Sequence, residues 1–147
     1  MIVNSPYPLV YGTPDSAAVD LQYHSMGEWS GILEPKSFAL IPTGVKVAFK
    51  PGYCGLVFIR SGLSTKGISL TNGVGLIDND YRGEIFVSVQ NLSDTTYQFV
   101  HGDRVAQLLM TEYSQMPFKY VSDDEWQDRI EREENFRRDG GFGSTGR

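Results

Sequence analysis

Residues 75–83 of this 147-residue chain read Gly-Leu-Ile-Asp-Asn-Asp-Tyr-Arg-Gly, and they place several reactive side chains on one short turn. Asp78 follows an apolar pair, so its carboxylate is expected at the edge of a core, where it would be rigid and partly dry. A carboxylate in that setting is suited to act as general base for a water molecule. A plainer interpretation stays open, in which Asn79 and Asp80 form a hairpin turn and Asp78 pairs with Arg82.

A second segment could bind an anion. Arg60, Ser61 and Gly62 follow an apolar run, so the turn could point backbone N–H groups at the anion while the guanidinium clamps it. In the alternative, Ser61 caps a helix and Arg60 is solvated. The spacing does not match a Walker-type loop, so that kind of triphosphatase machinery is not indicated.

Two isolated polar residues could complete a site. Asp20 stands between apolar neighbours and could hold a metal or a metal-bound water, or pair with a lysine or arginine. Gln107 lies in an apolar run and is expected either to face a site or to meet water on an edge strand. His24, His101 and one cysteine cannot furnish a zinc site of ordinary spacing, so any metal is expected to be Mg²⁺, held by substrate phosphates and carboxylate-bound water.

Turn residues recur about every 8–12 residues and separate short apolar or alternating runs, a pattern typical of an all-β sandwich, jelly roll or barrel. The run at 56–59 is expected to be buried on both faces, whereas Ile85, Val87 and Val89 should share one buried face. The expected strands cover residues 38–41, 45–49, 56–59, 84–90, 97–100 and 105–110.

The chain is expected to contain one β domain over residues 1–121, a charged connector over 122–136 and a C-terminal arm over 137–147. In the connector, Ser122 and Glu125 could form a capping box for a short helix, or the segment could be a solvated linker. The glycine-rich arm has the composition of a disordered segment unless it closes over a ligand.

Composition excludes several function classes. The net charge is −5 and the pI about 4.9, so there is no basic footprint for direct binding of nucleic acid. Cys54 is the only cysteine, which excludes an intrachain disulfide, and its apolar neighbours indicate buried packing. No leader segment or membrane-spanning run is recognisable, so a cytoplasmic protein is expected.

Five segments in order resemble the signature of the homotrimeric dUTPases (deoxyuridine triphosphate nucleotidohydrolases), from about residue 17 to the end of the chain. They are residues 18–21, 60–63, 75–83, 102–107 and 140–146. The resemblance implies a jelly-roll-like β fold in a trimer with three active sites at subunit interfaces. It further implies Mg²⁺-assisted hydrolysis of dUTP to dUMP and pyrophosphate, which keeps uracil out of DNA and supplies dUMP for thymidylate synthesis.

Each motif carries an implied role. Asp78 would activate the water that attacks the α-phosphorus, and Tyr81 would pack under the deoxyribose and reject ribonucleotides. Asp20 would help orient the metal through water. The uracil edge would be read by Asn72 and the backbone of the 72–81 hairpin, including Gly75 and Ile77. The phosphates would be held by Arg60, Ser61, Gly62 and Gln107. The arm residues implied in substrate binding are Arg137, Phe142, Gly143, Ser144 and Thr145.

Within the arm, Phe142 would stack on the uracil, while Arg137, Ser144 and Thr145 would grip the γ-phosphate. The family usually has glycine directly after the arm arginine, whereas this chain has Arg138, so either arginine could take that role.

Two alternatives share the scaffold. The dCTP deaminases resemble the same fold but carry a catalytic glutamate at what would be position 88, where this chain has Ser88. A regulatory protein that binds a repressor is the other alternative, and no residue of the sequence identifies such a partner.

Overall fold

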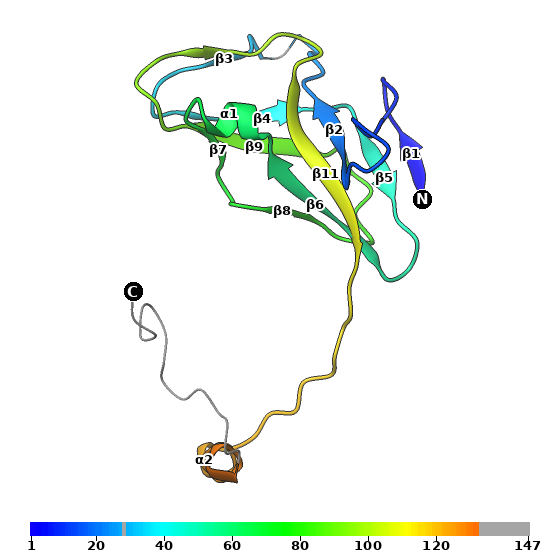
Figure 1. Cartoon of the computed structure of the whole chain (residues 1–147), viewed down its shortest axis with the longest axis vertical. Helices are drawn as coiled ribbons and strands as arrows, with labels where there is room; N and C mark the ends of the chain where they lie inside the picture. Colours follow the sequence, from blue (N-terminus) through cyan, green and yellow to red (C-terminus); the bar gives the residue numbers. More distant parts are fainter. Residues whose placement is uncertain (28, 133–147) are drawn as a thin grey trace. The chain divides into compact units, whose positions relative to one another are not determined.

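The computed structural model describes residues 1–27 and 29–132, which form eleven strands and two helices (Figure 1). The strands are β1 (Ile2–Asn4), β2 (Ala18–Gln22), β3 (Ile32–Leu33), β4 (Phe38–Pro42), β5 (Lys46–Ala48), β6 (Tyr53–Ile59), β7 (Ile68–Leu70), β8 (Gly75–Ile77), β9 (Phe86–Asn91), β10 (Tyr97–Gln98) and β11 (Arg104–Glu112). The helices are α1 (Ser61–Ser64) and α2 (Asp123–Arg132).

The strands pair in antiparallel fashion throughout. One sheet has the order β2-β11-β6-β8, a second has the order β4-β9-β7, and β1 with β5 and β3 with β10 form two-stranded pairs. In the larger sheet β11 and β6 are central, whereas β8 lies at an edge and, among the described residues, pairs only with β6. The predicted turn that follows β8 therefore leaves the sheet at its border.

Alternation along the strands builds the core. Ile85, Val87 and Val89 are buried, as their spacing predicts. The prediction that residues 56–59 are buried on both faces is wrong, because Val57 is buried while Phe58 is exposed. Successive side chains of a strand point to opposite faces, and the face that carries Phe58 is not covered by the second sheet.

Close packing surrounds the first half of β6. Cys54 is buried and free, in agreement with the prediction of a packing role. At Gly55 an added Cβ would lie 2.8 Å from both Leu108 Cδ1 and Phe49 Cζ. A glycine is therefore required at this point for the strand to approach its neighbours.

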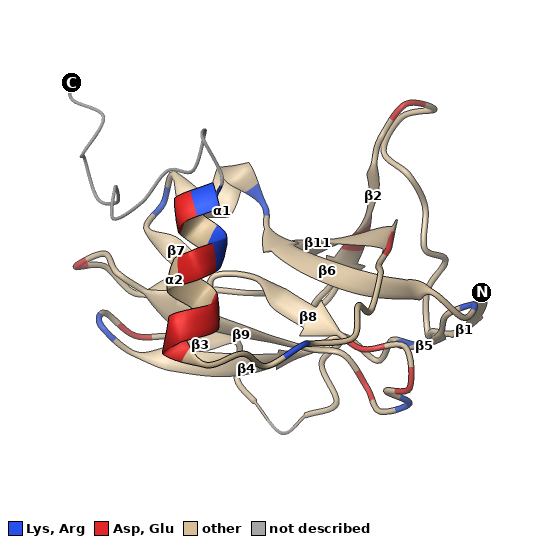
Figure 2. Cartoon of the chain, turned by 90° about the horizontal axis from the view of Figure 1, so that it is seen from below, with Lys and Arg blue, Asp and Glu red and all other residues tan. Residues whose placement is uncertain are grey.

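The chain divides into two compact units, Met1–Ser114 and Gln115–Arg147, whereas the sequence predicts a boundary after residue 121. In the second unit, α2 begins after Ser122, whose Oγ accepts a hydrogen bond from Glu125 N at 3.2 Å. Asp128 and Arg132 form an ion pair at 2.7 Å one turn apart on this helix, which carries both acidic and basic side chains (Figure 2). The predicted arm residues 137–147 lie outside the described residues.

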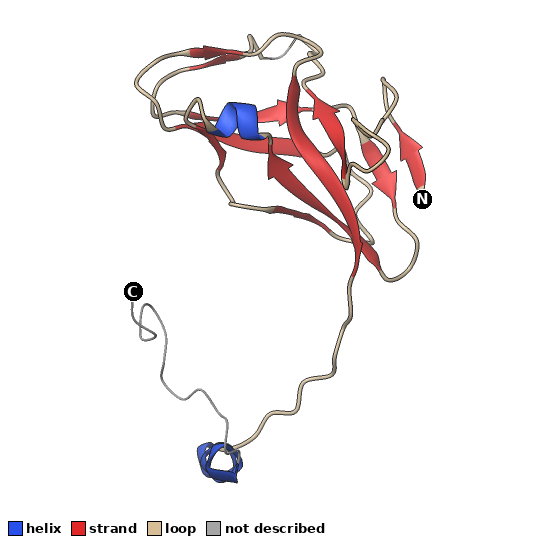
Figure 3. Ribbon diagram, viewed as in Figure 1, coloured by secondary structure: helices blue, strands red, loops and turns tan. Residues whose placement is uncertain are grey.

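Strands account for most of the regular structure of the first unit (Figure 3). The predicted all-β fold is confirmed. Neither of the two helices in the described ranges is both long and apolar enough to cross a membrane.

Candidate active site

Asp78 follows β8 directly and is exposed, which corrects the expectation of a half-buried carboxylate. The cause is the topology: β8 is an edge strand, so its own chain does not cover the residue that follows it. The alternative ion pair with Arg82 is also absent from the described part of the chain. Instead, Arg82 Nη1 donates to the carbonyls of Asn79 at 2.6 Å and Tyr81 at 2.8 Å.

Tyr81 lies in the same loop and is held by local contacts. Its backbone N–H donates to Asp78 O at 3.2 Å, and its hydroxyl donates to Glu84 O at 2.8 Å. The ring lies against Gly83, where a Cβ would come within 2.5 Å of the Tyr81 hydroxyl oxygen. The glycine at position 83 therefore allows the ring to fold back over the loop.

A pocket of about 190 Å³ opens beside these two residues. Its lining comprises Leu76, Ile77, Asp78, Tyr81, Glu84, Ile85 and Phe86. Four of these side chains are apolar, and two carboxylates and a phenol border the same space. This combination suits a ligand with a flat or apolar body and a reactive group near Asp78.

The residues that are predicted to bind the uracil base lie beside this pocket. Gly75 and Ile77 belong to β8 and face Val57 and Gly55 of β6, while Asn72 lies in the exposed turn before the strand. Because β8 has a neighbour on one side only, backbone N–H and C=O groups along its other edge are left without a strand partner. Such groups can match the donor and acceptor pattern of a base edge.

A second cluster forms around Asp20 in β2. Arg60 Nε lies 3.0 Å from Asp20 Oδ1, and Arg104 Nη1 lies 3.3 Å from Asp20 Oδ2. The Asp20 side chain is only 13% exposed, and Oδ1 has no hydrogen-bond partner despite its ion-pair distance to Arg60. The cluster therefore orients two guanidinium groups around one largely buried carboxylate.

Gln107 joins this cluster through the sheet. In register it lies between Asp20 of β2 and Phe58 of β6, on a central strand. The alternative of an edge-strand glutamine is therefore wrong. Ser61 and Gly62 begin the short helix α1 directly after Arg60, which is itself the N-cap, so the alternative in which Ser61 is the cap is also wrong.

These two groups of residues lie at opposite ends of β6. Asp78 follows Ile77, which is paired with Gly55 near the start of the strand, whereas Arg60 follows its last residue, Ile59. At about 3.3 Å per residue, the register separates Asp78 from Arg60 by about 20 Å along the strand. One copy of the chain therefore does not bring Asp78 together with the Asp20 cluster.

Sequence reasoning missed two contributors, Arg104 and Glu84. Arg104 belongs to the segment 102–107 but was assigned no role, and it is the second partner of Asp20. Glu84 follows the segment 75–83 and lines the pocket beside Asp78. The sequence feature that could have identified Glu84 is an acidic residue directly before a strand of alternating apolar residues.

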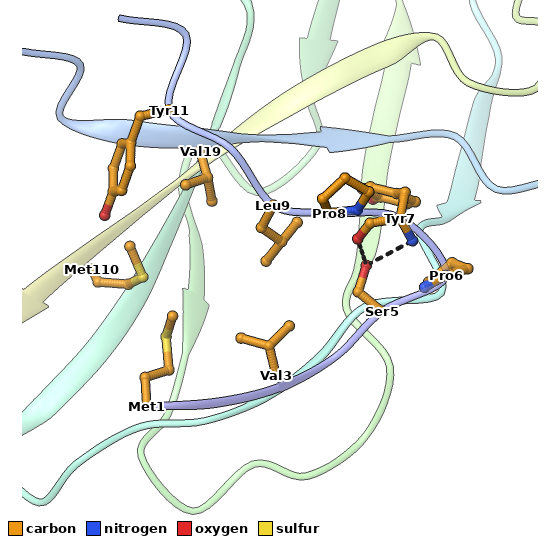
Figure 4. Close-up of a pocket in the computed structure, with 10 residues that line it drawn as sticks. All are labelled: Met1, Val3, Ser5, Pro6, Tyr7, Pro8, Leu9, Tyr11, Val19 and Met110. Atoms are coloured by element: carbon orange, nitrogen blue, oxygen red, sulfur yellow. Dashed lines mark hydrogen bonds between the residues drawn. The ribbon is translucent and has the colours of Figure 1, made fainter. Parts of the chain in front are cut away.

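Another hollow, of about 610 Å³, lies near the N-terminus and carries none of the predicted site residues (Figure 4). Its lining comprises Met1, Val3, Ser5, Pro6, Tyr7, Pro8, Leu9, Tyr11, Val19 and Met110. The only hydrogen bonds drawn within it join Ser5 to Tyr7. The groove has no charged side chain and is not a candidate for catalysis.

No group of three or more histidine, cysteine or acidic side chains suited to a metal occurs in the ranges 1–27 and 29–132. An all-protein cage is therefore missing from these residues. Asp20 fits a different mode, because a carboxylate can help hold Mg²⁺ by accepting a hydrogen bond from a water bound to the ion.

A family model described as dUTPase matches residues 9–146. The chain belongs to the dUTPase family. A relative from a Wolbachia strain of Drosophila simulans, named deoxyuridine 5'-triphosphate nucleotidohydrolase, is 43% identical over 140 residues, which cover 93% of this chain and 85% of the relative.

Solved dUTPase structures have the same fold. The crystal structure of dUTPase from Streptococcus mutans matches with a TM-score of 0.68 and 29% identity, over 75% of this chain and 88% of that chain. A variant dUTPase from phage phi11 of S. aureus matches with a TM-score of 0.72 and 25% identity, over 84% of this chain and 97% of that chain. That structure is described as revealing the coordination of a structural Mg(II) ion.

The family, the fold class and the enzyme class predicted from the sequence are thus confirmed for this dUTPase-family chain. At the position of the deaminase glutamate, the Ser88 hydroxyl accepts a hydrogen bond from Thr71 Oγ1 at 2.6 Å. No carboxylate occupies that position, so the residue provides no acid–base group for deamination.

Proposed function

We propose that the chain hydrolyses dUTP to dUMP and pyrophosphate in sites built between copies of the chain. The observation that carries this proposal is the pocket in which Asp78 and Tyr81 share one loop beside the unpaired edge of β8. The dUTPase family match over residues 9–146 supports the choice of substrate. In the cell this reaction would keep uracil out of DNA and supply dUMP for thymidylate synthesis.

Asp78 is the proposed general base. Its carboxylate takes a proton from a water molecule as the water oxygen forms a bond to the α-phosphorus. The bond from the α-phosphorus to the bridging oxygen breaks, and pyrophosphate leaves with that electron pair. Asp78 is exposed in one chain, so the dry setting that a base requires comes from the neighbouring subunit.

The uracil base and the deoxyribose are recognised beside Asp78. Asn72 and the backbone of β8, including Gly75 and Ile77, bind the uracil edge, and a mismatched base leaves these groups unpaired. The Tyr81 ring packs under the deoxyribose, where a 2′-hydroxyl would clash. Its hydroxyl is already bound to Glu84 O, so the ring presents its apolar face.

The phosphates are held by Arg60, Ser61, Gly62 and Gln107. Asp20 directs the Arg60 guanidinium through Nε and leaves its terminal nitrogens available for phosphate oxygens. Asp20 would also help hold Mg²⁺ through a bound water. Bound Mg²⁺ would neutralise part of the triphosphate charge. Phosphoryl transfer depends more on such charge neutralisation and on positioning than on covalent chemistry by the protein.

A trimer is the proposed assembly, with each site combining the Asp78 loop of one subunit and the Asp20 cluster of another. The separation of these two groups along β6 supports an intersubunit site. The C-terminal arm closes over the substrate through Arg137 or Arg138 and through Phe142, Gly143, Ser144 and Thr145. This closure expels water from the reacting centre.

The deciding experiment measures pyrophosphate release from dUTP, dCTP, dTTP and UTP by the purified protein, with and without Mg²⁺. Rapid Mg²⁺-dependent release from dUTP alone is expected. Release from none of the four would contradict the proposal and favour a binding protein on this scaffold. Equal release from dUTP and UTP would contradict the role assigned to Tyr81.

A further inference from the structure

The loop between β8 and β9, residues 78–85, lies outside every sheet ladder of the structure. It nevertheless carries both Asp78 and Tyr81, whose placement decides what the pocket can do. A loop without ladder bonds opens more readily than a strand unless other bonds fix it. Side chains near both ends of this loop supply such bonds.

Asn79 fixes the beginning of the loop. Its amide nitrogen donates to the carbonyl of Lys50 at 2.6 Å and to that of Tyr53 at 2.8 Å, so both amide hydrogens are used. The Lys50 carbonyl lies in the turn between β5 and β6, the Tyr53 carbonyl belongs to the first residue of β6, and Tyr53 N donates to Lys50 O at 3.1 Å. Asn79 thus joins the loop to a short, closed piece of backbone.

The peptide of Asn79 is held from a second direction. Its carbonyl accepts a hydrogen bond from Arg82 Nη1 at 2.6 Å. Asp78 is the preceding residue, and Asp78 O accepts from Tyr81 N at 3.2 Å. These two bonds lie within the loop and stiffen it, while the Asn79 amide bonds tie it to Lys50 and Tyr53.

Glu84 fixes the other end. Its Oε1 accepts hydrogen bonds from the backbone N–H groups of Thr43 at 3.1 Å and Gly44 at 2.8 Å, in the turn after β4. Its own carbonyl accepts the hydrogen bond from the Tyr81 hydroxyl at 2.8 Å. The carboxylate of Glu84 thus anchors the backbone group that holds the end of the Tyr81 side chain.

We propose that Asn79 and Glu84 are positioning residues, with Asn79 setting the place of the Asp78 carboxylate and Glu84 setting the place of the Tyr81 ring. The proposal rests on the proposed hydrolysis of dUTP and adds a division of labour to it. Loss of Asn79 impairs the chemical step, and loss of Glu84 relaxes the selection of deoxyribose over ribose. Small misplacements of reacting groups have large effects on rate, so both effects are measurable.

Asn79→Ala tests the first half. Its kcat for dUTP is expected to fall about 10-fold or more while KM and the preference for dUTP over UTP change less than about 3-fold. Gln98→Ala is the matched control, because Gln98 Nε2 also donates to two carbonyls, those of Ser30 at 3.1 Å and Phe99 at 2.9 Å. A wild-type kcat in Asn79→Ala, or an equal loss in Gln98→Ala, would overturn the role of Asn79.

Glu84→Ala and Glu84→Gln test the second half. The ratio of kcat/KM for dUTP to that for UTP is expected to fall about 10-fold or more in Glu84→Ala. Glu84→Gln keeps an acceptor oxygen for the two N–H groups and should restore the ratio to within about 3-fold of wild type. Glu34→Ala removes an exposed carboxylate that accepts from Thr96 and serves as the control. An unchanged ratio in Glu84→Ala would contradict the proposal.

Amide hydrogen exchange provides a readout that does not need activity. The amides of residues 78–84 should exchange faster in Asn79→Ala and Glu84→Ala, with the core strands unchanged. Unchanged exchange in the loop would overturn the anchoring. A wild-type protein without dUTP turnover would instead contradict the proposed function, and exchange alone would then decide whether the two anchors hold the loop.

Discussion

Arg60 Nε lies 3.0 Å from Asp20 Oδ1, so two residues from separate segments of the sequence form one electrostatic unit across the large sheet. Asp20 is on β2 and Arg60 follows β6, and the strand between them is β11, which carries Gln107. Arg104 from β11 completes the unit at the other carboxylate oxygen. This unit, which we propose binds phosphate, is therefore organised by strand register without a ligand.

Asp78→Asn should keep folding, assembly and dUTP binding while kcat falls by about 10²–10⁴, the usual contribution of a general base. The amide has nearly the same shape but does not accept the proton of the attacking water. Pyrophosphate release measures turnover, and the rise in melting temperature with a non-hydrolysable dUTP analogue measures binding. Asp94→Asn, which removes an exposed carboxylate paired with Lys36, is the control. Turnover at the wild-type level in Asp78→Asn would end the general-base hypothesis.

Deletion of residues 137–147 should leave the assembly intact and lower kcat/KM for dUTP sharply. The arm would no longer shield the reacting centre from water or contact the uracil and the γ-phosphate. Sedimentation reports the assembly, and steady-state kinetics reports the loss. Arg137→Ala and Arg138→Ala, measured side by side, identify the arginine that binds phosphate. Normal kinetics of the truncated chain would remove the arm from the mechanism.

Gly83→Ala should weaken selection against UTP, because the added Cβ would come within 2.5 Å of the Tyr81 hydroxyl oxygen and displace the ring. The measurement is the ratio of kcat/KM for dUTP to that for UTP. Gly12→Ala is the matched substitution, since its Cβ would meet only Ser16 Oγ at an ordinary 3.6 Å. If both variants keep the wild-type ratio, the position of the Tyr81 ring does not determine sugar selection.

Tyr7 should make stability depend on pH in the alkaline range. Burial is the main cause that raises the pKa of this phenol above 10.0, and the Glu84 charge adds to it, whereas the hydrogen bond with Gln22 acts in the opposite direction. Because the folded-state pKa is the higher one, the stabilisation is complete below the unfolded pKa and is lost as the pH rises through the folded pKa.

The melting temperature of Tyr7→Phe should therefore fall less steeply than that of wild type above about pH 10. Both proteins are compared at one concentration, since assembly also affects melting. Tyr120→Phe, at a ring that is 90% exposed, is the control. Parallel melting curves for wild type and Tyr7→Phe across this range would contradict the prediction.

The alternation of apolar and polar residues predicted which side chains of a strand are buried. Val87 and Val89 alternate with polar residues and are buried, and the apolar setting of Cys54 correctly indicated a packed thiol. Phe58 was misjudged because an uninterrupted apolar run does not reveal whether a second layer covers both faces of the strand.

The site shows the same limit. The order of the motifs predicted Asp20, Arg60 and Asp78 as site residues, but the distances between them depend on strand register, which local sequence does not specify. Asp78 follows an apolar pair, yet Leu76 is 59% exposed because it lies on an edge strand. The inference from apolar neighbours to a dry carboxylate failed because only one of them, Ile77, packs against the core, and within the described ranges the strand has no neighbour on its other side to cover the residue that follows.

The placement of Asp78 and Arg60 at opposite ends of β6 also has a genetic consequence. If each working site takes Asp78 from one subunit and Arg60 from another, two different inactive chains can complement each other. Mixed assemblies of Asp78→Asn and Arg60→Ala subunits would contain some interfaces where both intact residues meet and others where both defects coincide. Activity would then depend on sites formed between two chains, and co-expression of two null alleles would restore part of the activity.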